Sequence, residues 1–264
     1  MFLRKLFNSE NKLTWVFIDL LIVIIGVYCA FLIQNYAENQ KNAKERDRVV
    51  TALKYEMEAF RFLMTEISAG MKGETQKMKA ILAETNYSDF SNSRFIEPQY
   101  DYQTIEYALN LQNSSIVDFE LYNALQSLYV EIKKIEHAER LLTETSRRYH
   151  TLPSNLNKES DAYKLGWTEN YDNFVRYITL TEDRGSISSR IAKASTSSLS
   201  LVNKRLGPKK SKQIETELIL GYAKKVASEE HAVLLGKKYF PSFSEKEIKQ
   251  LYQQATQSKS NTKE

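Results

Sequence analysis

An uninterrupted apolar run near the amino terminus constrains this chain more than any other feature. Residues 13–33 read LTWVFIDLLIVIIGVYCAFLI and contain no Lys or Arg. As a helix, such a run is about 30 Å long, which is the thickness of the hydrocarbon core of a bilayer. Aromatic residues stand near both of its ends, as in an interfacial belt: Trp15, Phe17, Tyr28 and Tyr36. The run therefore predicts a transmembrane helix over residues 13–35, after a short tail over 1–12.

A signal peptide, a lipoprotein anchor and a soluble core helix each fit the run less well. A cleaved signal peptide needs a small-residue cleavage site, and the run has no clear A-x-A pattern. A lipoprotein needs a small residue before its lipidated cysteine, whereas Cys29 follows Tyr28. A soluble core helix is rarely apolar on every face. We therefore expect a retained single-pass anchor in the bilayer.

The charges that flank the run do not decide its orientation. Three basic residues precede it and four follow at a comparable distance: Arg4, Lys5 and Lys12, against Lys41, Lys44, Arg46 and Arg48. A long domain that follows a short tail can be translocated despite its charges. We expect a cytoplasmic amino terminus and an external domain, and the opposite orientation stays open.

The rest of the chain has the composition of a helical domain. The 8 Gly and 4 Pro are too few for a turn-rich β-sandwich. No segment alternates convincingly between apolar and polar residues with a period of two. We therefore predict an all-α fold, with an elongated helical bundle or coiled-coil-like domain over residues 36–257 and a frayed tail over 258–264.

Two long helices with heptad spacing should form the spine of this domain. The first is expected near 36–85, with Gly70 and Gly73 favouring a kink or break and Glu74 as a charged seam position. Its apolar seam is Val50, Leu53, Met57, Phe60, Met64, Ile67, Met71, Met78 and Ile81. The second is expected near 118–151, after Asp118 as N-cap. Its seam, interrupted by Glu139, is Leu121, Leu125, Leu128, Ile132, Ile135 and Leu142.

Shorter helices are expected elsewhere, between loops at 86–100 and 153–161. Gly207 and Pro208 should end one helix, and Ser244 with Glu247 forms a capping-box pattern that opens the last. The expected ranges are 101–111, 162–184, 186–206, 211–225, 228–239 and 244–257.

Asp19 is the most informative single residue, because an acid inside a span often marks a proton or ion path. It lies only about six residues from the start of the run, however, where it could face headgroups or a polar partner. Gly26, with Cys29 and Ala30, offers a small-residue face for helix pairing, and Gln34 is a further polar candidate at the end of the run. These residues are consistent with a homo-oligomer or with another membrane protein as partner.

A basic cluster surrounds the predicted helix stop at Gly207. It could contact anionic lipid or nucleic acid, although a solvated loop is the simpler interpretation. Its members are Lys204, Arg205, Lys209, Lys210 and Lys212. The net charge of +4 is small for 264 residues, and we expect no nucleic-acid partner.

The sequence contains no pattern of a known catalytic or cofactor site. One cysteine excludes an internal disulfide and a cysteine-rich zinc site. His137, His150 and His231 lack zinc-helix spacing, and no phosphate-binding or nucleophile-elbow motif occurs. We infer no catalytic residue, cofactor, metal or small-molecule substrate, and an enzyme with an unfamiliar site remains an alternative.

Two blocks of sequence resemble a large family of uncharacterised bacterial single-span membrane proteins. The first runs from Asp19 through Gly26 to Gln34, Asn35, Tyr36 and Glu38; the family usually has Trp and Asn where this chain has Tyr36 and Ala37. The second block is Leu109, Ser114, Ile116, Glu120, Leu121, Leu125 and Tyr129. The resemblance implies an amino-terminal anchor in a bacterial inner membrane with a helical domain in the periplasm, and it implies no activity.

Together these features predict a membrane-anchored helical scaffold or sensor-like protein that acts through protein–protein contacts. The alternative is an accessory subunit of an ion-driven or transport complex that uses Asp19.

Overall fold

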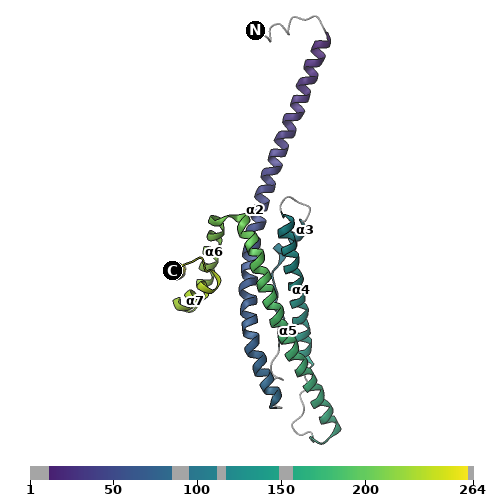
Figure 1. Ribbon diagram of the computed structural model, residues 1–264, viewed down its shortest axis with the longest axis vertical. Helices are drawn as coiled ribbons and strands as arrows, with labels where there is room; N and C mark the ends of the chain where they lie inside the picture. Colours follow the sequence, from purple (N-terminus) through teal and green to yellow (C-terminus); the bar gives the residue numbers. More distant parts are fainter. Residues whose placement is uncertain (1–11, 85–94, 112–116, 149–156, 261–264) are drawn as a thin grey trace. The chain divides into compact units, whose positions relative to one another are not determined.

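The computed structural model describes residues 12–84, 95–111, 117–148 and 157–260, without the side chains of 12–20, 22 and 258–260. The described residues form helices and no strand, which confirms the all-α class (Figure 1). The helices are α2 (Lys12–Ala83), α3 (Gln103–Asn110), α4 (Phe119–Arg147), α5 (Asp161–Leu206), α6 (Pro208–Ala223), α7 (Glu229–Tyr239) and α8 (Glu245–Ser260).

The chain divides into two compact units, Met1–Arg48 and Val49–Glu264, and α2 contributes to both. The predicted tail over 1–12 lies outside the described residues, except for Lys12. In the part of the first unit that is described, the apolar side chains of α2 are exposed. Among the residues that the structure describes, no helix is both long enough and apolar enough to cross a membrane.

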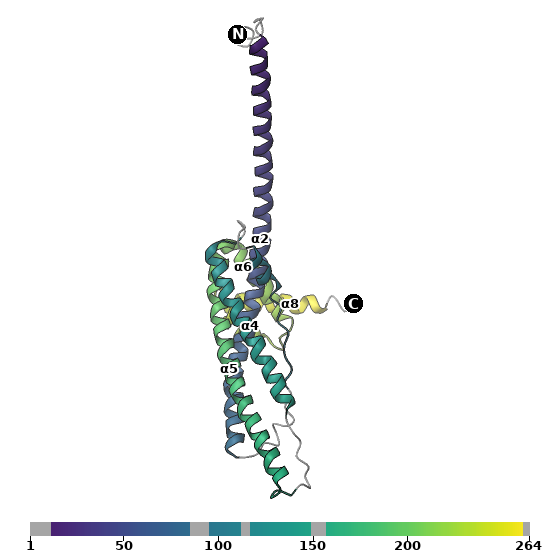
Figure 2. The same ribbon diagram turned by 90° about the vertical axis from the view of Figure 1, so that its right-hand side faces the viewer.

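Three long helices form the spine of the second unit, where two were predicted (Figures 1 and 2). The end of α2 from Val49 onward, α4 and α5 share one apolar core, with α3 packed against it. The apolar residues of both predicted seams lie in or against the core, and Met78 and Ile81 are half-buried against the cluster that holds Leu142. Fully buried members include Leu53, Met57, Met64, Leu121, Leu125, Leu128, Ile132 and Ile135.

One predicted seam position of α2, Glu74, is corrected, whereas the later positions Met78 and Ile81 still pack against the core. Glu74 is exposed, and Thr75 is buried in its place with its hydroxyl donating to the Met71 carbonyl at 2.7 Å. A four-residue step replaces the expected three-residue step, so the charged side chain faces solvent. The helix also continues through Gly70 and Gly73, so the predicted break there is wrong.

The predicted helices over 162–184 and 186–206 are one helix, α5, of 46 residues. Gly185 lies between the two predicted ranges, and in the structure it marks a close approach between helices. A Cβ atom at Gly185 would lie 3.0 Å from the Cβ of Met71 on α2. The glycine therefore lets two long helices pack tightly, and the gain in packing outweighs its low helix propensity.

The C-terminal helices are bounded by the signals that the sequence predicts at Gly207 and Ser244. Gly207 has φ 77° and ψ 161°, a conformation that is essentially restricted to glycine, and it separates α5 from α6. Before α8, the Ser244 amide donates to Glu247 at 2.8 Å and the Glu247 amide donates to the Ser244 hydroxyl at 3.3 Å. This is the predicted capping box. The helix continues to Ser260, past the expected start of the frayed tail.

Candidate functional site

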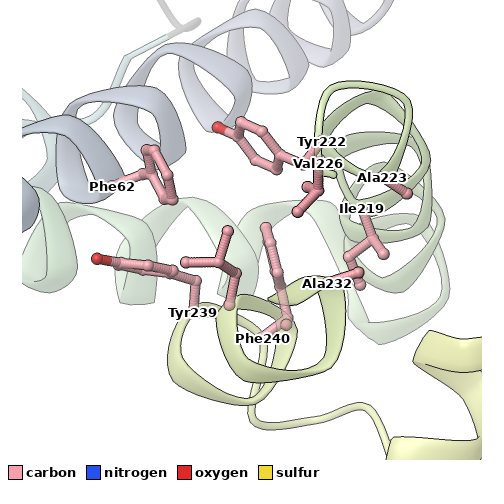
Figure 3. A pocket seen from close by; sticks show the side chains of 10 residues that line it. Phe62, Ile219, Tyr222, Ala223, Val226, Ala232, Tyr239 and Phe240 are labelled. Atoms are coloured by element: carbon pink, nitrogen blue, oxygen red, sulfur yellow. The ribbon is translucent and has the colours of Figure 1, made fainter. Parts of the chain in front are cut away.

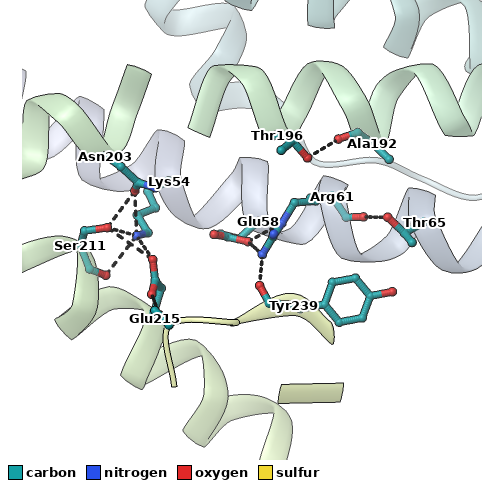
Figure 4. Close-up of polar contacts among 11 residues, drawn as sticks. Lys54, Glu58, Arg61, Thr65, Ala192, Thr196, Asn203, Ser211, Glu215 and Tyr239 are labelled. Carbon is teal, nitrogen blue, oxygen red and sulfur yellow. Dashed lines mark hydrogen bonds and ion pairs between the residues drawn. The ribbon is translucent and has the colours of Figure 1, made fainter. Parts of the chain in front are cut away.

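A fully buried lysine lies where α6 packs against the spine (Figure 4). The Lys54 ammonium on α2 donates to Asn203 Oδ1 at 2.8 Å and to the Ser211 carbonyl at 3.0 Å. It also contacts the Ser211 hydroxyl, and it forms an ion pair with Glu215 Oε1 at 2.7 Å. Each of these partner atoms is an acceptor, as required by an ammonium group that can only donate. One side chain of α2 is thereby tied to α5 and α6.

A second ion pair lies one helical turn further along α2. The Arg61 guanidinium donates to Glu58 Oε2 from Nε at 2.9 Å, and it also contacts the Tyr239 carbonyl at the end of α7. Burial raises the pKa of the Glu58 carboxyl, although Arg61 beside it opposes this effect. The two pairs carry no net charge together, and they join α2 to α5, α6 and α7.

A polar cavity of about 380 Å³ adjoins these pairs. Glu58, Arg61 and Glu215 line it, together with Ser242, whose hydroxyl donates to Glu215 Oε2 at 3.0 Å. Its size falls within the range of small-molecule sites. The charged side chains on its wall are already ion-paired within the protein, however, and these pairs hold the C-terminal helices against the spine.

The neighbouring apolar cavity is part of the packed core (Figure 3). Phe62 of α2 stacks on Tyr222 with ring centroids 5.0 Å apart, and its ring lies 4.7 Å from that of Tyr239. Ile219 and Phe240 complete the enclosure. The free volume is about 20 Å³, which is close to one water molecule and far below a ligand site.

A second buried charge cluster lies between α4 and α5. Glu139, which interrupts the predicted seam, has no exposed surface and pairs with Arg184 Nε at 2.6 Å. The Tyr100 hydroxyl donates to the same carboxylate oxygen at 2.6 Å, while Oε2 has no hydrogen-bond partner among the described residues. Burial raises the pKa of Glu139, against the opposing hydrogen bonds from Tyr100 and Arg184. The cluster fixes how α4 and α5 face each other.

The predicted anchor residues all lie on α2, and none of them is a member of either charge cluster. The Asp19 side chain lies outside the described residues. A Cβ atom at Gly26 would meet nothing within 4 Å, and Gln34 is exposed. The structure therefore brings none of the described anchor residues into a site with another side chain.

The predicted basic cluster is partly neutralised by acids from other helices. Arg205 pairs with Asp118, the N-cap of α4, and Lys212 pairs with Glu247 of α8 at 3.0 Å. Lys204 and Lys209 are exposed, and Lys210 is half-buried. These contacts join helix ends, so the five residues do not form one uniformly cationic surface.

Sequence reasoning missed Lys54, Glu58 and Arg61. They stand at or beside seam positions of α2, where a long polar side chain is usually solvated. The partners of Lys54 and Arg61 on α6 and α7 lie 157 to 178 residues further along the chain, so no local spacing reveals them. Glu139 did leave a signal, because a charge within a regular heptad seam needs a buried partner.

No family model, curated protein or solved structure matches this chain. Among the described residues, no group of three or more His, Cys, Asp or Glu side chains is placed to hold a metal ion.

Proposed function

We propose that this chain is a membrane-anchored helical scaffold that acts through protein–protein contacts. The observation that carries the proposal is the exposure of an apolar stretch of α2. Large side chains from Leu21 to Tyr36 are about half to two-thirds exposed on all faces of the helix: for example, Ile24 58%, Val27 66%, Phe31 59% and Ile33 70%. Such a surface is stable in lipid and costly in water.

The sequence on the amino-terminal side extends this surface to the length of a bilayer. Residues 13–33 contain one charged residue, Asp19. The resemblance to single-span membrane proteins supports the same arrangement, with the amino terminus in the cytoplasm and Val49–Glu264 outside it. Gly26 is the position at which a second anchor helix could approach most closely, as expected for a homo-oligomer.

The architecture of Val49–Glu264 supports a scaffold role. Long helices with paired buried charges form a stiff support, and its open grooves are suited to binding other proteins. In the charge clusters around Lys54 and Glu139, acidic side chains pair with basic ones, and these pairs join neighbouring helices.

Extraction of membranes from cells that produce the full chain tests the anchor. The protein should stay in the pellet after sodium carbonate and enter solution only with detergent. A variant with Leu21, Ile25 and Leu32 changed to Lys should move to the soluble fraction. Release of the unaltered chain by carbonate would refute the anchor.

Orientation is tested by cysteine labelling in the full chain. In a Cys29→Ser background, Gln257→Cys should react in intact cells with a membrane-impermeant maleimide. Ser9→Cys should react only after the cells are opened. The reverse pattern would place the helical domain in the cytoplasm and contradict the proposed location.

A further inference from the structure

The spine of three long helices has three grooves, and other described segments of the chain lie over parts of two of them. Tyr100 and the start of α3 lie over α2 and α4. Glu56 of α2 accepts from the Thr104 amide at 3.0 Å, the Tyr100 ring lies 6.1 Å from that of Phe60, and the Tyr100 hydroxyl donates to Glu139 of α4 at 2.6 Å. The groove between α2 and α5 receives α6 and α7 around Lys54 and Arg61. Further along it is open, with a hollow of about 780 Å³ lined by small and polar side chains such as Ser68, Ala192 and Lys193. The groove between α4 and α5 is hollow over about 630 Å³.

The walls of this third groove, the α4/α5 groove, have helical spacing on both sides. The α4 wall is formed at steps of four, three and four by Val130, Lys134, His137 and Leu141. The α5 wall is formed at steps of three, four and three by Leu180, Asp183, Ile187 and Arg190. Side chains at these steps form a straight stripe on each helix, and two adjacent stripes form the trough into which a further helix packs. Figures 1 and 2 both show α4 and α5 side by side along their length.

The groove wall combines apolar side chains with an excess of cations, because Lys133, Lys134 and Arg190 outnumber the one lining acid, Asp183. Val130 is 46% exposed, an unusual exposure for a valine that borders a packed core. Lys134 and Arg190 are 52% and 48% exposed, whereas Glu131, which pairs with both, is 16% exposed. The cations thus face outward and their carboxylate partner lies deeper, so an approaching partner meets positive charge first.

The covered parts of the spine show which kinds of side chain pack against its cations. Over α2 and α5, the covering helix α6 supplies Glu215 and the spine supplies Lys54. Phe240, directly after α7, places an apolar ring beside Arg61 of the spine. A helix with an apolar stripe and acidic borders would repeat this arrangement on the third groove.

We propose that the α4/α5 groove binds a helix of a partner protein that is apolar along one face and bordered by carboxylates. This inference names the partner surface of the proposed scaffold and rests on that function. A second copy of this chain fits less well, because a two-fold pairing of the same groove would bring Lys134 and Arg190 toward their own copies.

Peptide binding to the full chain in detergent tests the chemistry. The probes are two synthetic helical peptides of four heptads with the same Leu stripe, bordered by Glu in one and by Lys in the other. Fluorescence anisotropy should show at least tenfold tighter binding of the Glu peptide. The variant K134E/R190E should reverse this preference, and Val130→Asp should abolish binding of both peptides.

Equal affinity for both peptides, or binding that Val130→Asp leaves intact, would overturn the proposal. Far-UV circular dichroism verifies that each variant keeps its helix content. Because Val130 and Lys134 are exposed, a fold defect is not the expected cause of lost binding. Carbonate extraction of the same variants separates the two proposals, since groove variants should leave membrane attachment unchanged.

Photo-crosslinking in intact cells tests for the natural occupant. A photoreactive amino acid at His137, which lines the groove, should give an adduct with another protein. The same amino acid at Gln76, exposed on α2, is the control and should give none. Mass spectrometry should place the linkage in an acidic amphipathic helix. An adduct of two copies of this chain, linkage to a different kind of segment, or no adduct would contradict the proposal.

Discussion

At the scale of single residues, the domain depends on a few charges inside an apolar spine. Lys54 and Glu139 are fully buried, and each meets an opposite charge at hydrogen-bond distance. Replacing such a pair with apolar groups can cost little, whereas removing one partner leaves a charge without compensation. The pairs therefore specify which helices meet, and each is sensitive to the loss of one member.

Lys54→Met should destabilise the domain by about 3 kcal/mol, because Glu215 loses its buried partner. For a domain of this size the melting temperature should fall by roughly 6–12 °C. Thermal melts of the full chain in detergent, followed by circular dichroism, measure the change. The double variant K54M/E215Q should recover part of the loss.

The matched control is Lys79→Met, which removes an ion pair with Glu182 in which both side chains are about half exposed. Its effect should stay within about 1 kcal/mol. Equal effects of Lys54→Met and Lys79→Met would show that burial of Lys54 adds nothing to stability.

At the scale of elements, two glycines inside long helices have different surroundings: one allows a close helix contact and the other does not. Gly70 and Gly185 both lie inside long helices, but an added Cβ meets nothing within 4 Å at Gly70 and meets Met71 at 3.0 Å at Gly185. Sequence alone treats the two positions alike, since glycine lowers helix propensity at each of them.

Gly70→Ala should therefore stabilise the domain by about 0.5–1 kcal/mol. Gly185→Ala should gain less or lose stability, and Gly185→Leu should lose about 1–3 kcal/mol by forcing α2 and α5 apart. Melting temperatures of the three variants test the ranking. If Gly185→Leu were as stable as the unaltered chain, the close approach would be refuted.

The start of α8 should respond to pH through Glu247. The Ser244 amide, and then Lys212 and the Ser244 hydroxyl, lower the pKa of this carboxyl to about 2. Because the pKa in the folded state lies below the ordinary value of 4.5, the stabilisation is complete above about pH 4.5 and is lost as the pH falls toward 2.

Glu247→Gln should thus lower the melting temperature at neutral pH. The difference from the unaltered chain should shrink steadily between pH 4.5 and pH 2. Melts across this range measure it, with Lys246→Gln as a control outside the capping box. A difference that is independent of pH would mean that the charge of Glu247 does not act at this helix start.

At the scale of the whole molecule, the boundary between the two units lies within one continuous helix. The second unit begins at Val49 and holds the described apolar core of the spine, together with both charge clusters. The exposed apolar surface of α2 belongs to the first unit. Stability and membrane attachment should therefore separate when the chain is cut at this boundary.

A chain that begins at Val49 should fold and remain in solution without detergent. Its circular dichroism should show a helical domain with a cooperative melt, and size exclusion should show no aggregate. The fragment 1–48, fused to a soluble reporter, should carry the reporter to the membrane. A Val49–Glu264 fragment that is unfolded would show that the first unit is needed for the core.

The sequence by itself determined the helical class, the apolar residues of both seams, and the helix ends at Asp118, Gly207 and Ser244. These features depend on spacing and on groups within four residues. Only the tertiary structure decided the rest. Gly185 lies inside one helix because Met71, far away in sequence, packs against it. Lys54 and Glu139 are buried because Glu215 and Arg184 reach them from helices that the fold brings close. Such pairings depend on the meeting of distant segments, and local periodicity carries no information about them.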